Sequence, residues 1–134
     1  MGWFCMSELN IVAEWFRYAQ NDLISARHLF ETIYPKQLEI ASYHCQQCAE
    51  KALKAFIIGK DIEPPKTHDL KLLCKMCQDI NSSFADIVNQ CANLTSYGSA
   101  ARYPDELSPD ENIVKRLISE AQQVYDFCIS KIEG

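Results

Sequence analysis

Polar side chains recur at three- and four-residue steps in the middle of the chain, and their types suit phosphate binding. His44, Gln47, Lys51 and Lys54 fall on one side of a helix, because such steps come close to whole turns. Residues 51–75 hold six lysines against three acidic residues, a charge of +3 in a chain whose net charge is −5. A basic segment in an acidic protein predicts an anion-facing surface.

Two further segments extend this candidate site. His68 is predicted to open a helix, whose first backbone N–H groups and positive dipole end favour anions. Arg102 and Tyr103 lie in a loop predicted over residues 99–107, and the planar guanidinium fork suits phosphate oxygens. We therefore expect a non-catalytic, ligand-binding site without a cofactor, formed by six residues: Gln47, Lys51, Lys54, His68, Arg102 and Tyr103.

Each of these residues also has a structural interpretation. The two lysines fit a solvated face paired with Glu50 or other acids, and His44 fits a hydrogen bond at the edge of the core. His68 fits a local contact with Thr67 or Asp69, and Arg102 fits a brace to a carboxylate. The spacing alone leaves both interpretations open.

The seven cysteines allow a metal site or a set of buried thiols. Cys45-x-x-Cys48 and Cys74-x-x-Cys77 resemble a zinc tetrad, but the 25 residues between the pairs exceed the usual spacing, and both pairs fall inside predicted helices. Their positions on apolar stripes favour small hydrophobic side chains in a core. We therefore expect no metal, and reduced thiols typical of a cytoplasmic protein.

The apolar periodicity predicts an all-α, up-and-down bundle of about five helices and a single domain over residues 8–133. The helices are expected at about 8–32, from Pro35 to Gly59, 68–80, 83–97 and from Ser108 to the C-terminal end. Thr67 and Ser108 are predicted caps, and Gly59 a C-terminal stop. The fourth helix should bury an apolar set: Phe84, Ile87, Val88, Cys91 and Leu94.

The first predicted helix carries two apolar stripes, and together they are wider than the surface that packing in a single bundle usually buries. The first stripe comprises Val12, Phe16, Ala19, Leu23, Ala26 and Phe30. The second comprises Ile11, Trp15, Tyr18, Leu29 and Ile33, and Asp22 interrupts it. Because a monomer would leave the second stripe partly wet, we expect a homodimer with this helix at or near the interface.

Several functional classes are disfavoured by what the sequence lacks. No run of eighteen apolar residues occurs, and the first residues do not resemble a secretory signal, so we expect no membrane segment. No glycine-rich phosphate loop or nucleophile with a supporting His–acid pair is recognisable. Translation from Met6 instead of Met1 stays open.

Four segments together resemble the HEPN family (higher eukaryotes and prokaryotes nucleotide-binding domain), over about residues 12–130. They are Asn21-Asp22-Leu23 with Ala26, the segment from His44 to Ala55, Thr67-His68-Asp69-Leu70, and Arg102-Tyr103-Pro104-Asp105. The resemblance implies a helical bundle that often dimerises and that accompanies a small nucleotidyltransferase as its substrate-binding or toxin–antitoxin partner.

Some members of that family are metal-independent RNases that carry an arginine and a later histidine with four to six residues between them. This chain departs from that pattern, because no arginine precedes His28, His44 or His68 at that spacing. The preferred hypothesis is therefore a non-catalytic module that binds a nucleotide or RNA phosphate. The alternatives are an RNase with a variant site around Arg102, and a dimeric scaffold without a small ligand.

Overall fold

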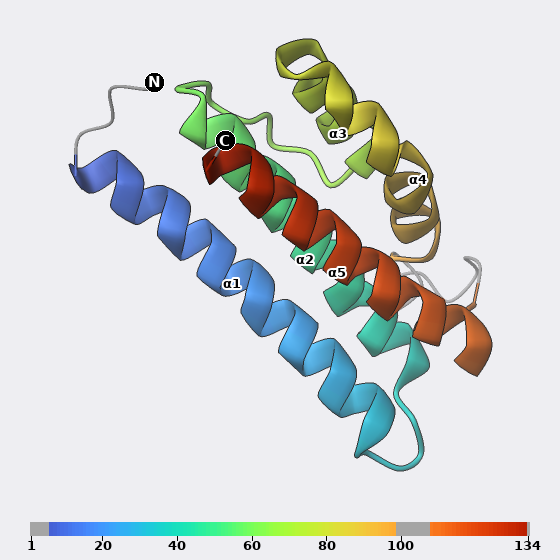
Figure 1. Cartoon of the computed structure of the whole chain (residues 1–134). Coiled ribbons are helices and arrows are strands. Elements are labelled where there is room, and N and C mark those ends of the chain that lie inside the picture. The colour runs from blue at the N-terminus through green and yellow to red at the C-terminus, as the bar shows by residue number, and fades with distance from the viewer. Residues whose placement is uncertain (1–5, 99–107, 134) are drawn as a thin grey trace.

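The computed structural model describes residues 6–98 and 108–133, and every regular element in these ranges is a helix. Three long helices, α1 (Met6–Glu31), α2 (Leu38–Gly59) and α5 (Glu111–Glu133), run side by side. Two shorter helices, α3 (Leu70–Ile80) and α4 (Val88–Tyr97), cover the side of α2 and α5 that faces away from α1 (Figure 1). The predicted all-α bundle is confirmed.

The buried side chains follow the predicted apolar stripes. Val12, Phe16, Ala19, Leu23 and Ala26 of α1 are buried, and Phe30 is partly covered at the edge of the core. Phe56, Phe84 and Phe127 form a stack of aromatic contacts where α2, α5 and the chain before α4 meet, with ring centroids 4.5 and 4.9 Å apart. Burial of these apolar faces supplies most of the driving force for folding.

Six cysteines lie in this core, at least one on each of α2, α3, α4 and α5. All six are free and buried: Cys45, Cys48, Cys74, Cys77, Cys91 and Cys128. The Cys48 thiol donates a long hydrogen bond to the carbonyl of Ala121, and the Cys77 thiol donates one to Leu53. These cysteines fill space as small apolar side chains.

Two of the predicted helix starts are displaced by local hydrogen bonds. The second helix begins at Leu38, because residues before it bond back to α1, with Lys36 Nζ 2.6 Å from the carbonyl oxygen of Phe30. The third begins at Leu70, because the cap is the Asp69 carboxylate and not Thr67. The Thr67 hydroxyl accepts from the amide of Asp69 instead, so His68 lies just outside the helix.

The last helix is capped by Asp110, whose side chain accepts from the amide of Ile113, and not by Ser108. The fourth predicted helix begins as a 3₁₀ segment, η1 (Ser82–Ile87), before it becomes α4. A 3₁₀ segment turns with three residues instead of 3.6, which shifts the phase of the side chains. The predicted burial of Val88 is therefore wrong, and Val88 is exposed.

Gly59 ends α2 as predicted, but the left-handed residue that reverses the chain is Asp61, with φ 64°. The amide of Ile62 bonds to the carbonyl of Ile57, and that of Asp61 bonds to Ile58, in the pattern of a Schellman motif. Gly59 packs closely against α5, and a Cβ there would lie 2.4 Å from Cδ1 of Ile132, so the end of that side chain would have to move. This turn directs residues 61–66 back along α2.

Candidate functional site

Asp22 is a buried carboxylate between α1 and α2, and it holds a histidine and a lysine from the facing helix. Its Oδ1 lies 2.8 Å from Nδ1 of His44, and its Oδ2 accepts from Nζ of Lys51 at 2.6 Å. His44 and Lys51 are seven residues apart, so two turns of α2 present both to the same point on α1. These three residues form the Asp22 cluster.

Glu50 is a second buried carboxylate, on the side of α2 toward the loop that leads to α3. Its Oε2 accepts from Nζ of Lys54 at 3.0 Å, and its Oε1 lies 3.0 Å from Nδ1 of His68. Gln46 donates to the same Oε1 and to the backbone carbonyl of His68. Glu50, Gln46, Lys54 and His68 form the Glu50 cluster, which ties the loop to α2.

The Glu50 cluster keeps its carboxylate ionised. Burial raises the pKa of Glu50, and hydrogen bonds from Lys54, His68 and Gln46 lower it. The hydrogen bonds together have the larger effect, so the pKa of Glu50 is below its ordinary value. An ionised Glu50 can only accept hydrogen bonds, so the hydrogen lies on Nδ1 of His68 and Nε2 is left for another partner. The His68 side chain is 69% exposed, so Nε2 can reach a ligand.

The two clusters leave less free positive charge on this face than the lysine content suggested. Lys51 and Lys54 each contact a buried carboxylate, so their charges are largely balanced within the protein. Lys66, in the loop, has no hydrogen-bond or ion-pair partner among the described residues and is exposed. It is the lysine beside the clusters whose charge is available to an anion.

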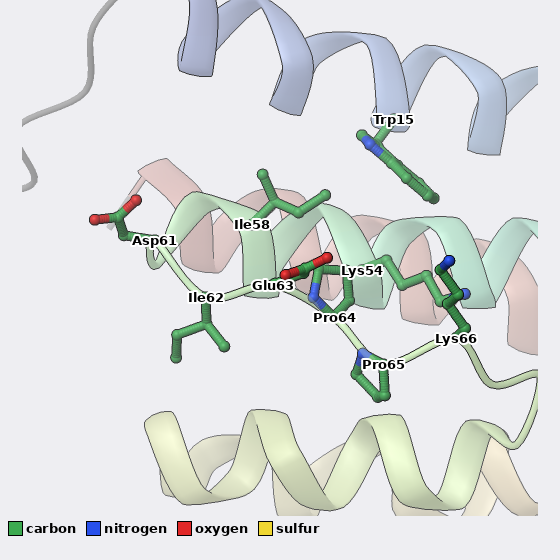
Figure 2. Close-up of a pocket in the computed structure, with 9 residues that line it drawn as sticks. All are labelled: Trp15, Lys54, Ile58, Asp61, Ile62, Glu63, Pro64, Pro65 and Lys66. Atoms are coloured by element: carbon green, nitrogen blue, oxygen red, sulfur yellow. The ribbon is translucent and has the colours of Figure 1, made fainter.

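Two hollows of about 600 Å³ each meet at Trp15, next to the clusters. One is lined by α1 residues and Lys51: Asn10, Ile11, Glu14, Trp15, Tyr18 and Lys51. The other lies between α1, α2 and the loop, and Figure 2 shows its lining: Trp15, Lys54, Ile58, Asp61, Ile62, Glu63, Pro64, Pro65 and Lys66. Each hollow thus combines the half-buried Trp15 with at least one lysine.

The structure brings four of the six sequence-predicted site residues together. Lys51 and Lys54 line the two hollows, His68 belongs to the Glu50 cluster, and Gln47 lies on the same side of α2. Gln47 donates to the hydroxyl of Tyr43, and its buried Oε1 has no partner among the described residues. The remaining two, Arg102 and Tyr103, lie outside the described residues.

The contacts also decide between the structural interpretations of these residues. Lys54 pairs with Glu50, as the solvated-face interpretation supposed, although the pair is buried. His44 makes the expected hydrogen bond at the edge of the core, with Asp22. The partner of His68 is Glu50, neither Thr67 nor Asp69.

Sequence reasoning did not identify Asp22, Glu50 and Trp15 as members of the site. A signal for Asp22 was present, because a carboxylate that interrupts an apolar stripe must find partners when it is buried. Glu50 precedes Lys54 by four residues, the spacing of a helical ion pair. The place of Trp15 depends on how the loop folds back along α2, which local periodicity does not contain.

The cysteine pairs do not join a site of this kind. Among residues 6–98 and 108–133, no three His, Cys, Asp or Glu side chains gather in a way that could hold a metal ion. Nor does any helix in these ranges have the length and apolar character needed to cross a membrane. The groups gathered at the site are imidazoles, ammonium groups, two buried carboxylates and the aromatic side chain of Trp15.

Comparison with known proteins identifies the family. The family model of the HEPN domain matches residues 12–132. The crystal structure of ST0689, an archaeal HEPN homologue, has 26% sequence identity and a TM-score of 0.71, over 90% of this chain and 97% of that one.

The crystal structure of TT1696 from Thermus thermophilus shares the fold, with a TM-score of 0.75 and 22% identity over the same shares of the two chains. A search of curated proteins found no match. The family model spans both buried clusters and Trp15, where the two hollows meet, and the chain belongs to the HEPN domain family.

Proposed function

We propose that this protein is a non-catalytic module that binds the phosphate of a nucleotide or RNA on the face formed by α1, α2 and residues 61–68. The observation that carries the proposal is the meeting of two hollows at Trp15, with Lys51, Lys54 and Lys66 around them. The exposed side chain of His68, whose Nδ1 is held by Glu50, adds its Nε2 as a hydrogen-bonding group beside Lys54. Ammonium and imidazole groups beside an aromatic side chain suit a phosphate attached to an organic group.

The internal pairing of Lys51 and Lys54 sets the expected strength of binding. A phosphate would approach lysines whose charge is already balanced, so the interaction should be weak and should decline as salt rises. Lys66, and Arg102 in the sequence-predicted loop, supply the additional positive charge in this proposal.

Calorimetry with a short single-stranded RNA at low salt tests the proposal. Lys66→Ala and Arg102→Ala should each weaken binding by about 1 kcal/mol. Lys51→Gln should do the same, because the amide can still donate to Asp22 while the positive charge is lost. Lys75→Ala is the matched control, since Lys75 is an exposed lysine paired with Asp79 on α3. Absence of binding at low salt would leave the scaffold alternative.

We also propose that the protein forms a homodimer through α1. Ile11 and Tyr18 of the second apolar stripe are 47% and 49% exposed, whereas Leu29 packs against the core. The exposed part of the stripe is therefore shorter than the sequence indicated. Ile11→Asp should lower the sedimenting mass from two chains to one, and Ile24→Asp, an exposed α1 position outside the stripe, should not.

The proposed protein partner is a nucleotidyltransferase, and its support is family membership. No RNA cleavage is expected in the absence of metal. An assay on structured and unstructured RNA tests this expectation, and cleavage that His68→Ala or Arg102→Ala abolishes would make the module an enzyme.

A further inference from the structure

The hollow between α1 and the loop has two apolar walls and a floor. Trp15 projects from α1 toward Pro64 and Pro65, and Ile58 and the methylene groups of Lys54 lie on α2 between them (Figure 2). The volume, about 600 Å³, lies within the range of small-molecule sites. An indole ring opposite two proline rings favours a planar guest, which contacts both walls at once.

The charges around this hollow are unequally distributed. The side chains of Lys54 and Lys66 reach the same end, next to the ring of Trp15, and Asp61 lies at the opposite end (Figure 2). Lys54 already pairs with Glu50, whereas Lys66 has no partner among the described residues. The hollow therefore suits a planar ring whose anionic group points toward Lys66 and away from Asp61.

We infer that this hollow is a subsite for one unpaired nucleobase, which stacks on Trp15 while its own phosphate contacts Lys66. The inference rests on the proposed phosphate-binding function and adds the part of the ligand that the lysines do not recognise. Stacking on an indole tolerates every base, because each base has a π face. A purine, with the larger ring, gains more contact than a pyrimidine, and a base paired in a duplex cannot enter.

Trp15 serves this subsite on the side toward the loop, whereas Ile11 and Tyr18 belong to the other hollow. A dimer contact through Ile11 and Tyr18 is therefore compatible with a base on the loop side of Trp15. Tyr34 offers a matched control, as an exposed aromatic residue that lines neither hollow.

Fluorescence titration of the full chain carrying Trp3→Phe tests the inference, because Trp15 is then the only tryptophan. Adenosine monophosphate should quench this fluorescence and bind about tenfold more tightly than ribose 5-phosphate, which has no base. Cytidine monophosphate should fall between them. Single-stranded oligoadenylate should bind more tightly than the same strand in a duplex.

Variants separate the base from the phosphate, with affinities measured by calorimetry. Trp15→Leu should lower the affinity for adenosine monophosphate about tenfold and leave that for ribose 5-phosphate unchanged, and Trp15→Phe should restore part of the loss. Lys66→Ala should weaken the binding of both ligands about fivefold, and Tyr34→Leu should weaken neither. The comparison of adenosine monophosphate with ribose 5-phosphate uses the protein with Trp15 and Lys66 intact. It therefore tests the base subsite even if one of these variants fails to fold.

The possible failures point to different conclusions. Equal affinities for adenosine monophosphate and ribose 5-phosphate would overturn the base subsite and leave the phosphate-binding function standing. Binding of adenosine without any gain from the phosphate would overturn both the function and the orientation toward Lys66. Absence of binding by every ligand, inorganic phosphate included, would overturn the function and the subsite together.

Discussion

The Asp22 cluster and the Glu50 cluster contain the same chemical groups, a buried carboxylate with one histidine and one lysine, in different places in the fold. Asp22 comes from α1 and joins two helices, with its partners His44 and Lys51 both on α2. Glu50 and Lys54 lie one turn apart on α2, and the long-range member is His68, in the loop before α3. The first therefore connects helices, and the second anchors a loop.

The two clusters also differ in which of their side chains is exposed to solvent. The side chain of His68 is 69% exposed and that of His44 is 27% exposed, while Lys54 is 10% exposed and Lys51 28%. In the Glu50 cluster the lysine is enclosed and the histidine faces solvent. A carboxylate that balances a lysine inside the protein can thus also orient an imidazole outside it, so stability and ligand contact depend on one buried group.

Glu50→Gln should give the largest loss of stability in this comparison. The substitution leaves the enclosed Lys54 without its anion, and removing one partner of a buried pair costs about 3 kcal/mol. Urea unfolding followed by circular dichroism measures the change. Asp79→Asn is the control, because the exposed Lys75–Asp79 pair should contribute less than about 1 kcal/mol. Equal effects of the two substitutions would contradict the assignment of Glu50 as a buried anchor.

The same carboxylate predicts how stability depends on pH. The pKa of Glu50 is lower in the folded protein than its ordinary value of 4.5, so its contribution is fully present above that value. The contribution should decline as the pH falls below 4.5 toward the folded pKa, because Glu50 then binds a proton in the unfolded chain while it is still ionised in the folded protein. Unfolding midpoints of the wild type and Glu50→Gln should therefore converge as the pH falls below 4.5. A difference that stays constant as the pH falls would exclude Glu50 as the cause.

Asp22→Asn should have a smaller effect on stability, about 1–2 kcal/mol, since Lys51 keeps access to water. The substitution also removes the negative charge that balances Lys51 beside the hollow. RNA binding at low salt should therefore become several-fold tighter, in contrast to Glu50→Gln, which releases the loop at His68. Unchanged binding would place the phosphate away from Lys51.

Local pattern accounts for much of the fold and for only part of the site. Residue spacing predicted the five helices and the burial of Phe16, Cys45 and Leu117, because one turn of helix decides which side chains share a face. Val88 escaped this logic because the 3₁₀ segment before it changed the phase. Helix starts were less predictable, because side chains such as Lys36 and Asp69 compete for the same backbone groups.

The site shows the same limit more strongly. Spacing placed Lys51 and Lys54 on one side of a helix, and in the structure they line the two neighbouring hollows. It left the pairing of Lys54 with Glu50 as one of two interpretations. It did not show that Lys51 meets Asp22, because that contact spans 29 residues and depends on the rotation of α1 against α2. The available charge of Lys66 likewise follows from the path of the loop after Asp61, which a single left-handed residue redirects.

The reactivity of the buried cysteines can be used to measure local unfolding of the helices. Burial raises the pKa of Cys45 to about 12 and that of Cys48 higher still, so these thiols react slowly while the core is closed. Each of α2, α3, α4 and α5 carries at least one such thiol. Rates of thiol alkylation, resolved by mass spectrometry, would therefore give the free energy with which each of these helices separates from the others under native conditions.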